Sequence, residues 1–145
     1  MERGTATRTR RAKGGFRSAD EMREALDRAL ERADADQVTG PLLRATGLRL
    51  RVECPDIGLV LNLASGDGPD RCIEWRFGDD APWEAKLRLR MDSEVADRWL
   101  QGDLSIPIAI ARGEVTCSGN ARFALLYLPA AKLIGEHYRE AIRQS

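Results

Sequence analysis

The chain has 145 residues, with 23 Lys and Arg, 23 Asp and Glu, and a formal net charge of zero. This length suits one domain, a hydrophobic content of 43% excludes wholesale disorder, and the balanced charge argues against a dedicated nucleic-acid binder, which usually has a basic excess. The charges are unevenly distributed along the chain, because residues 1–17 hold six basic groups and one acid. We therefore predict a disordered basic arm over residues 1–17, followed by a single domain over residues 18–145.

Two helices are predicted at the start of this domain. Ser18 and Glu21 form a capping box, and the apolar residues after it recur at helical spacing. The first helix should therefore bury Met22, Ala25, Leu26, Ala29, Leu30 and Ala33. A second, short helix is predicted around residues 36–45, with Val38, Leu42 and Leu43 buried.

The next part of the chain alternates apolar and polar residues, which is typical of strands. Four such segments lie at residues 48–54, 57–63, 73–77 and 85–91, and their short connections favour an antiparallel meander with one buried face. A helix capped by Asp92 and ended by Gly102 should follow, then a fifth strand at residues 114–118 and a helical segment to Ile142 that Pro129 interrupts. The predicted class is α/β (α+β): a five-stranded, mostly antiparallel sheet covered by helices on one face.

Few residues carry recognisable chemistry. Cys54, Cys72 and Cys117 are odd in number and widely spaced, which fits neither a disulfide framework nor a zinc site and favours core thiols in a reducing cytoplasm. The single histidine, His137, lies near the end of an amphipathic helix and is interpreted as structural or surface-exposed. The sequence has no phosphate-binding glycine loop and no apolar run of the ~18–20 residues that a membrane span needs. We expect no cofactor and no bound metal.

Apolar residues are in excess late in the chain. Residues 106–110 are mostly apolar, and over residues 123–134 apolar side chains occur nearly all round the predicted last helix rather than on one stripe. A helix of this kind is deeply buried or faces another apolar body. The pattern leaves four interpretations open: core packing, a lipid cavity, a subunit interface, or docking on a membrane surface.

Small residues follow the fourth predicted strand at a distinctive spacing. Met91-Asp-Ser-Glu is followed by Gly102, Ala109, Gly113, Val115, Gly119 and Asn120, and then by an apolar helix with Ala124. In this order and spacing, residues 47–143 resemble the sterol carrier protein type 2 (sterol-transfer) family. The resemblance implies a fold whose helices and five-stranded sheet enclose an elongated apolar cavity. It also implies binding of sterols, fatty acyl chains, acyl-CoA or isoprenoid lipids without chemical change. Because Arg outnumbers Lys 20 to 3, we expect a stand-alone bacterial member.

The resemblance also suggests which side chains would form the wall of the cavity. Leu87, Leu89 and Met91 would form the sheet side, Trp99, Ile106 and Ile110 the middle, and Phe123, Leu126, Tyr127, Ile134 and Tyr138 the helical lid. The hydroxyl of either tyrosine would meet a lipid head group, or would be solvated as part of ordinary packing.

The leading hypothesis is a cytoplasmic lipid-binding or lipid-transfer protein that is not an enzyme. Its expected partners are a lipid or other apolar small molecule and, transiently, a membrane surface, with no nucleic acid. Its expected state is a monomer or weak dimer. The alternative is an accessory or self-associating module that docks on a partner enzyme through its apolar C-terminal helices. An enzyme is a third hypothesis, motivated only by His137 beside Tyr138.

Overall fold

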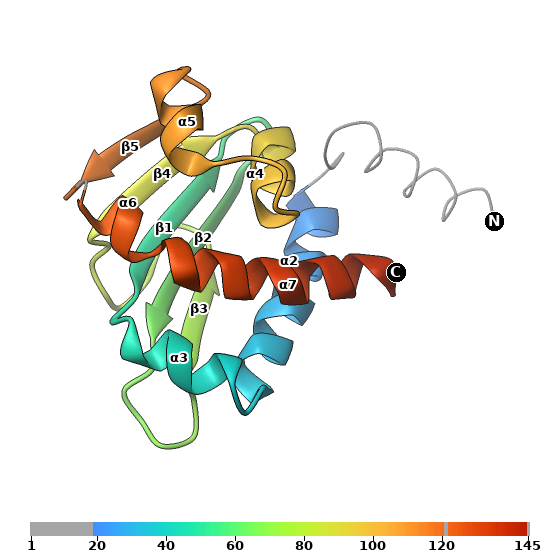
Figure 1. The fold of residues 1–145 in the computed structure, drawn as a ribbon, viewed down its shortest axis with the longest axis vertical. Coiled ribbons are helices and arrows are strands. Elements are labelled where there is room, and N and C mark those ends of the chain that lie inside the picture. Colours follow the sequence, from blue (N-terminus) through green and yellow to red (C-terminus); the bar gives the residue numbers. More distant parts are fainter. Residues whose placement is uncertain (1–18, 121, 145) are drawn as a thin grey trace.

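The computed structural model describes residues 19–120 and 122–144. The predicted basic arm over residues 1–17 and Ser18 of the predicted capping box lie outside these described residues. In chain order the elements are α2 (Ala19–Ala35), α3 (Thr39–Ala45), β1 (Arg49–Cys54), β2 (Leu59–Ser65), β3 (Ile73–Phe77), β4 (Leu87–Met91), α4 (Ser93–Leu100), α5 (Ile106–Ala111), β5 (Val115–Gly119), α6 (Arg122–Leu126) and α7 (Leu128–Arg143). Figure 1 shows α7 lying across α2, in front of the sheet.

Helix α2 confirms the predicted helix. Its buried residues are the six that helical spacing selects: Met22, Ala25, Leu26, Ala29, Leu30 and Ala33. The helix packs closely on α7, and its leucines also face the sheet. The apolar stripe of α2 therefore contacts both α7 and the sheet, and it forms part of the core of the domain.

Helix α3 corrects part of the prediction for residues 36–45. Leu43 is fully buried, but Val38 is 68% exposed and Leu42 is 49% exposed. Val38 precedes the first helical residue, and Leu42 is displaced by about 100° from its neighbour Leu43 around the helix axis. Only one side chain of the three can therefore point inward. The turn before α3 is held by Asp36, whose Oδ1 accepts the backbone N–H groups of Val38 and Thr39, each at 2.8 Å.

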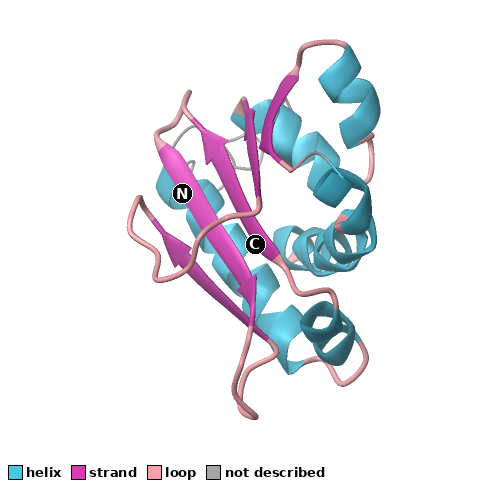
Figure 2. Cartoon of the chain, turned by 90° about the vertical axis from the view of Figure 1, so that its left-hand side faces the viewer, coloured by secondary structure: helices cyan, strands magenta, loops and turns pink. Residues whose placement is uncertain are grey.

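The sheet has the strand order β3-β2-β1-β4-β5. Strands β1 and β2, β2 and β3, and β4 and β5 pair antiparallel, which confirms the predicted mostly antiparallel class. The predicted four-strand meander is wrong at its last step, because β4 pairs in parallel with β1 instead of joining β3. The connection over residues 78–86 carries the chain back across the sheet, and Figure 2 shows it passing over the strands on the side turned to the viewer. A strand's alternation is the same beside either neighbour, so it does not select between them.

One face of this sheet is apolar over four strands. The ladder aligns Leu61 with Val52, Val52 with Leu89, and Leu89 with Cys117. The neighbouring row aligns Leu63, Leu50 and Leu87. Helices α2, α4 and α7 contribute side chains to the same interior. The helices therefore cover one face of the sheet, as predicted.

The C-terminal half brings α4 and α7 together at a glycine. A Cβ atom added to Gly135 of α7 would lie 2.5 Å from the carbonyl oxygen of Leu100 in α4. The predicted interruption at Pro129 is confirmed, because α6 ends at Leu126 and Pro129 lies in the first turn of α7. Among the described residues, no helix is both long enough and apolar enough to cross a membrane.

Candidate functional site

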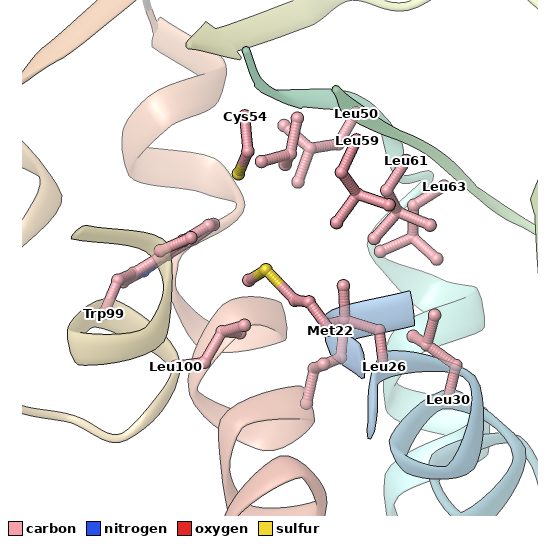
Figure 3. Close-up of a pocket in the computed structure, with 13 residues that line it drawn as sticks. Met22, Leu26, Leu30, Leu50, Cys54, Leu59, Leu61, Leu63, Trp99 and Leu100 are labelled. Atoms are coloured by element: carbon pink, nitrogen blue, oxygen red, sulfur yellow. The ribbon is translucent and has the colours of Figure 1, made fainter. Parts of the chain in front are cut away.

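An apolar hollow lies between the sheet and the helices. Its volume is about 40 Å³. We call it the inner hollow, and its wall is Met22, Leu26 and Leu30 of α2, Leu50, Val52 and Cys54 of β1, Leu59, Leu61 and Leu63 of β2, Ala96, Trp99 and Leu100 of α4, and Ile134 of α7. Figure 3 shows the strand side chains facing those of α2 across the hollow, with Trp99 and Leu100 on its flank. Every lining side chain is apolar apart from the indole N–H and the thiol.

A second apolar space, the side hollow, lies under α5, α6 and the start of α7. It has a volume of about 20 Å³ and is lined by Leu50, Leu87, Leu89, Trp99, Ile106, Ala124, Tyr127, Leu128 and Ala131. Strands β1 and β4 form its floor through three leucines. The parallel pairing of these strands is what places Leu50 next to Leu87, so the unpredicted topology builds this part of the site.

An open groove on the surface borders both hollows. The groove has a volume of about 390 Å³ and runs between the segment from α4 to α5 and the outer side of α7. Its wall is Trp99, Leu100, Gly102, Leu104, Ser105, Ile106, Leu128, Ala131, Lys132, Gly135 and Arg139. Lys132 and Arg139 bring two positive charges to an otherwise mostly apolar surface. Gly102 has a φ of +85°, which glycine adopts without strain and which lets the chain turn out of α4 along the groove.

The predicted cavity residues are distributed unevenly over these spaces. Leu87, Leu89, Trp99, Ile106 and Tyr127 come together around the side hollow. Ile134 instead lines the inner hollow. Four further predicted residues line none of the three spaces: Met91 and Tyr138 are buried in the core, and Ile110 and Phe123 pack against it. Leu126 is 55% exposed and also lies outside them. At about 40 and 20 Å³, the inner hollow and the side hollow are each too small to be the ligand-holding cavity that the resemblance implies.

Both tyrosine hydroxyls are used within the fold. Tyr127 accepts a hydrogen bond from the backbone N–H of Arg49 at 3.2 Å and donates one to the carbonyl oxygen of Gly47 at 3.4 Å. Burial raises the pKa of the Tyr127 phenol above its ordinary value. Tyr138 is completely buried and donates to Oδ1 of Asp97 at 2.6 Å. These bonds tie β1 to the start of α7 and α4 to α7, so each hydroxyl has a structural use.

The other reactive groups of the described chain are also placed structurally. Burial raises the pKa of the Cys54 thiol to about 12, so this wall of the inner hollow is neutral and unreactive at pH 7. Nε2 of His137 lies 3.2 Å from Oγ1 of Thr39 and 3.9 Å from Oδ2 of Asp36. A catalytic triad requires the carboxylate on the other ring nitrogen, and this arrangement differs from it. No cluster of three or more His, Cys, Asp or Glu in residues 19–120 and 122–144 could hold a metal ion.

Sequence reasoning missed most of the wall of the inner hollow. Met22, Leu26 and Leu30 were predicted as buried, and Leu59, Leu61 and Leu63 were predicted to share a strand face, but none was assigned to a ligand site. The only sequence signal for this wall is the alternation of Leu59, Leu61 and Leu63, which gives β2 a long apolar face. It could not be separated from ordinary core packing, since a core and an apolar cavity use the same side chains.

No protein-family model matches the sequence, and no curated protein matches it. Solved structures do match its fold. The conserved hypothetical protein TT1886 from Thermus thermophilus, described as a possible sterol carrier protein, is 17% identical with a TM-score of 0.59, covering 81% of this chain and 86% of that one. Apo sterol carrier protein 2 from Yarrowia lipolytica is 11% identical with a TM-score of 0.57, covering 81% and 91%. The UbiJ-SCP2 ubiquinone synthesis protein is 17% identical with a TM-score of 0.52, covering 72% and 86%. At these identities the likeness concerns the fold: the chain has the fold of sterol carrier protein 2.

Proposed function

We propose that this protein binds hydrophobic lipid ligands, such as fatty acyl chains, acyl-CoA, sterols or isoprenoid lipids, and carries them without chemical change. The observation that supports this most strongly is that a mostly apolar surface groove shares wall residues, Trp99, Leu100 and Ile106 among them, with two apolar hollows against the sheet. The names of the sterol carrier proteins that share the fold add support from analogy. The function is therefore inferred from the site first and from the fold second.

Burial of a hydrocarbon chain is sufficient to drive such binding. Each buried methylene group contributes about 0.8 kcal/mol, so a chain of ~16 groups gains at most roughly 13 kcal/mol. The loss of translational and rotational freedom offsets roughly 4–15 kcal/mol of this. Lipid binding in the micromolar to nanomolar range then requires only apolar side chains that exclude water from the hydrocarbon chain, and no catalytic group. Lys132 and Arg139 at the groove favour a ligand whose polar end is anionic.

Native mass spectrometry tests the proposal directly. Delipidated protein would be mixed separately with palmitate, palmitoyl-CoA, cholesterol and ubiquinone, and lipid that co-purifies with the protein would be extracted and identified. We expect a one-to-one adduct with at least one of these lipids. Failure to bind any of the four, together with no co-purified lipid, would contradict the proposal.

A pair of variants on one strand provides a matched control. Leu61 lines the inner hollow, while its neighbour Val60 points to the opposite face of β2 because side chains alternate along a strand. The Leu61→Phe side chain would occupy the hollow and should weaken lipid binding at least tenfold. Val60→Phe should leave the affinity within about twofold. Equal effects of the two substitutions would indicate that the lipid binds elsewhere.

A second candidate function is docking on a partner protein or on a membrane surface. The face of α7 that was predicted to dock is largely packed on α2 and α4, which removes most of it from use. Leu125 and Leu126 of α6 and Ile108 of α5 remain exposed by 55–64%. Sedimentation of the lipid-loaded protein tests self-association, and a strict monomer argues against that form of the second function.

We further propose that the protein is not an enzyme and works in the cytoplasm as a monomer or weak dimer. The placement of Thr39 and Asp36 on a single nitrogen of His137 supports the first point. The three cysteines, all of them free thiols, support a reducing compartment. A His137→Ala variant that binds lipid as the wild type does would agree with the first point, whereas a substrate-converting activity that this substitution abolishes would contradict it.

A further inference from the structure

Trp99 is the residue at which the three apolar spaces meet. Its side chain is the single one, among the described residues, that lines the inner hollow, the side hollow and the surface groove together. The spaces also share walls in pairs: Leu50 belongs to both hollows, and Leu100 belongs to the inner hollow and the groove. The three spaces are therefore neighbours arranged around one indole ring. Figure 3 shows this ring extending from α4 at the flank of the inner hollow.

The sizes of these spaces differ by about an order of magnitude. The groove measures about 390 Å³, which lies within the ~300–1,000 Å³ typical of small-molecule sites. The hollows measure about 40 and 20 Å³, far below the ~150 Å³ that holds a benzene molecule in an engineered cavity. A hydrocarbon chain fits the groove as the protein stands. It reaches the strand leucines only if the indole moves aside.

Packing alone holds the indole in this position. Within residues 19–120 and 122–144, the Trp99 N–H has no hydrogen-bond partner, whereas the N–H of Trp75 donates to Oδ1 of Asp27 at 2.8 Å. Trp99 is half-buried, lies in the last turn of α4 and precedes the positive-φ residue Gly102. Displacing the ring from the hollows toward the groove therefore breaks no hydrogen bond among these residues.

From this geometry we infer that Trp99 sets how much of a hydrocarbon chain the protein admits. A short chain occupies the groove and leaves the ring in place. A long chain displaces the ring, joins the groove to the inner hollow and extends between α2 and the strands β1 and β2. This inference rests on the proposed lipid-binding function and adds a selectivity for chain length that is located in one side chain.

Substitution of Trp99 and measurement of two ligands test the inference. Octanoate and palmitate differ by eight methylene groups, and each additional buried methylene changes the dissociation constant by about fourfold. In Trp99→Ala the passage is already open, while both ligands lose the contact of the indole in the groove. The ratio of the octanoate to the palmitate dissociation constant should therefore rise at least tenfold over that of the wild type. Trp75→Ala is the matched control, because Trp75 lines none of the three spaces, and it should alter neither constant.

A second measurement keeps the native packing around the ring. Replacing Trp75 and Trp83 with phenylalanine leaves Trp99 as the only tryptophan, and its emission maximum reports the polarity around the indole. Palmitate should shift this maximum and octanoate should not. Trp99→Phe, which retains an aromatic ring, should raise the ratio of the two dissociation constants less than Trp99→Ala does.

The outcomes separate this inference from the proposed function. If the wild type binds neither fatty acid and no other lipid, the proposed function fails and the inference fails with it. If the wild type binds both, but Trp99→Ala keeps the same ratio of the two constants, lipid binding stands and the inference is overturned. Unchanged emission of the sole-tryptophan protein on palmitate binding would also overturn it.

Discussion

Replacing Gly135 with alanine tests how closely α7 and α4 approach. Gly135 is buried in the middle of α7, and a Cβ atom at this position would lie 2.5 Å from the Leu100 carbonyl oxygen and 3.4 Å from its carbonyl carbon. The atom that it meets belongs to the backbone, so the clash cannot be relieved by a change of side-chain rotamer. The two helices must separate to accept one methyl group.

Two effects of opposite sign determine the result. Alanine is favoured over glycine inside a helix by about 1 kcal/mol. Overpacking of an interior costs about 1–3 kcal/mol and occasionally more, and a backbone clash belongs at the upper end of that range. We expect a net destabilisation of about 1–2 kcal/mol, which lowers the Tm by roughly 3–10 °C in a domain of this size.

Thermal and chemical unfolding measure the change. Gly68→Ala is the matched control, because a Cβ atom there meets nothing within 4 Å and the same substitution should be neutral or stabilising by up to about 1 kcal/mol. A Gly135→Ala protein as stable as the wild type, or more stable, would refute the reasoning. Because Leu100 lines the inner hollow and the groove, separation of the helices should also change lipid affinity.

Three further predictions concern single side chains. Tyr138→Phe removes the hydrogen bond to buried Asp97 and should cost about 1–3 kcal/mol in denaturant unfolding; an unchanged midpoint would contradict this. The raised pKa of Cys54, about 12 against the ordinary 9.0, leaves about a thousandfold less thiolate at pH 8, so a thiol reagent should label Cys54 far more slowly than the other two cysteines until the protein is unfolded. The Asp36 carboxylate accepts backbone N–H groups of Thr39 and Val38, which lower its pKa below 3.8. Its contribution to stability is present above pH 3.8 and is lost as the pH falls through the lowered folded-state pKa, so Tm should drop less on acidification in Asp36→Asn than in the wild type.

Local periodicity in the sequence was enough to predict those helices whose apolar spacing is the same whichever element packs against them. The six buried residues of α2 follow from helical spacing alone, and the break between α6 and α7 follows from the missing N–H of Pro129. The prediction failed where the outcome depended on neighbours. Val38 and Leu42 are apolar, yet of the three predicted residues only Leu43 is buried, and the other buried positions of α3 are Thr39 and Gly40. The alternation of β4 is likewise equal beside β3 and beside β1.

The candidate site divides in the same way. Leu87, Leu89, Trp99, Ile106 and Tyr127 could be grouped from the sequence because a family resemblance orders the segments that carry them. The wall of the inner hollow could not be distinguished, because Leu61 and its neighbours have the same pattern in a solid core and around a cavity. No sequence pattern reports the volume left between packed side chains.

By itself, then, the sequence determined the type and extent of most helices and strands and the apolar face of the sheet, because each depends on residues close together in the chain. Tertiary structure alone decided that β4 lies parallel to β1, that α4 and α7 meet at Gly135, and that Trp99 stands between a groove and two hollows. Each of these depends on the distance between atoms that are far apart in sequence. Such distances follow from the packing of the whole domain, and the site is a product of that packing.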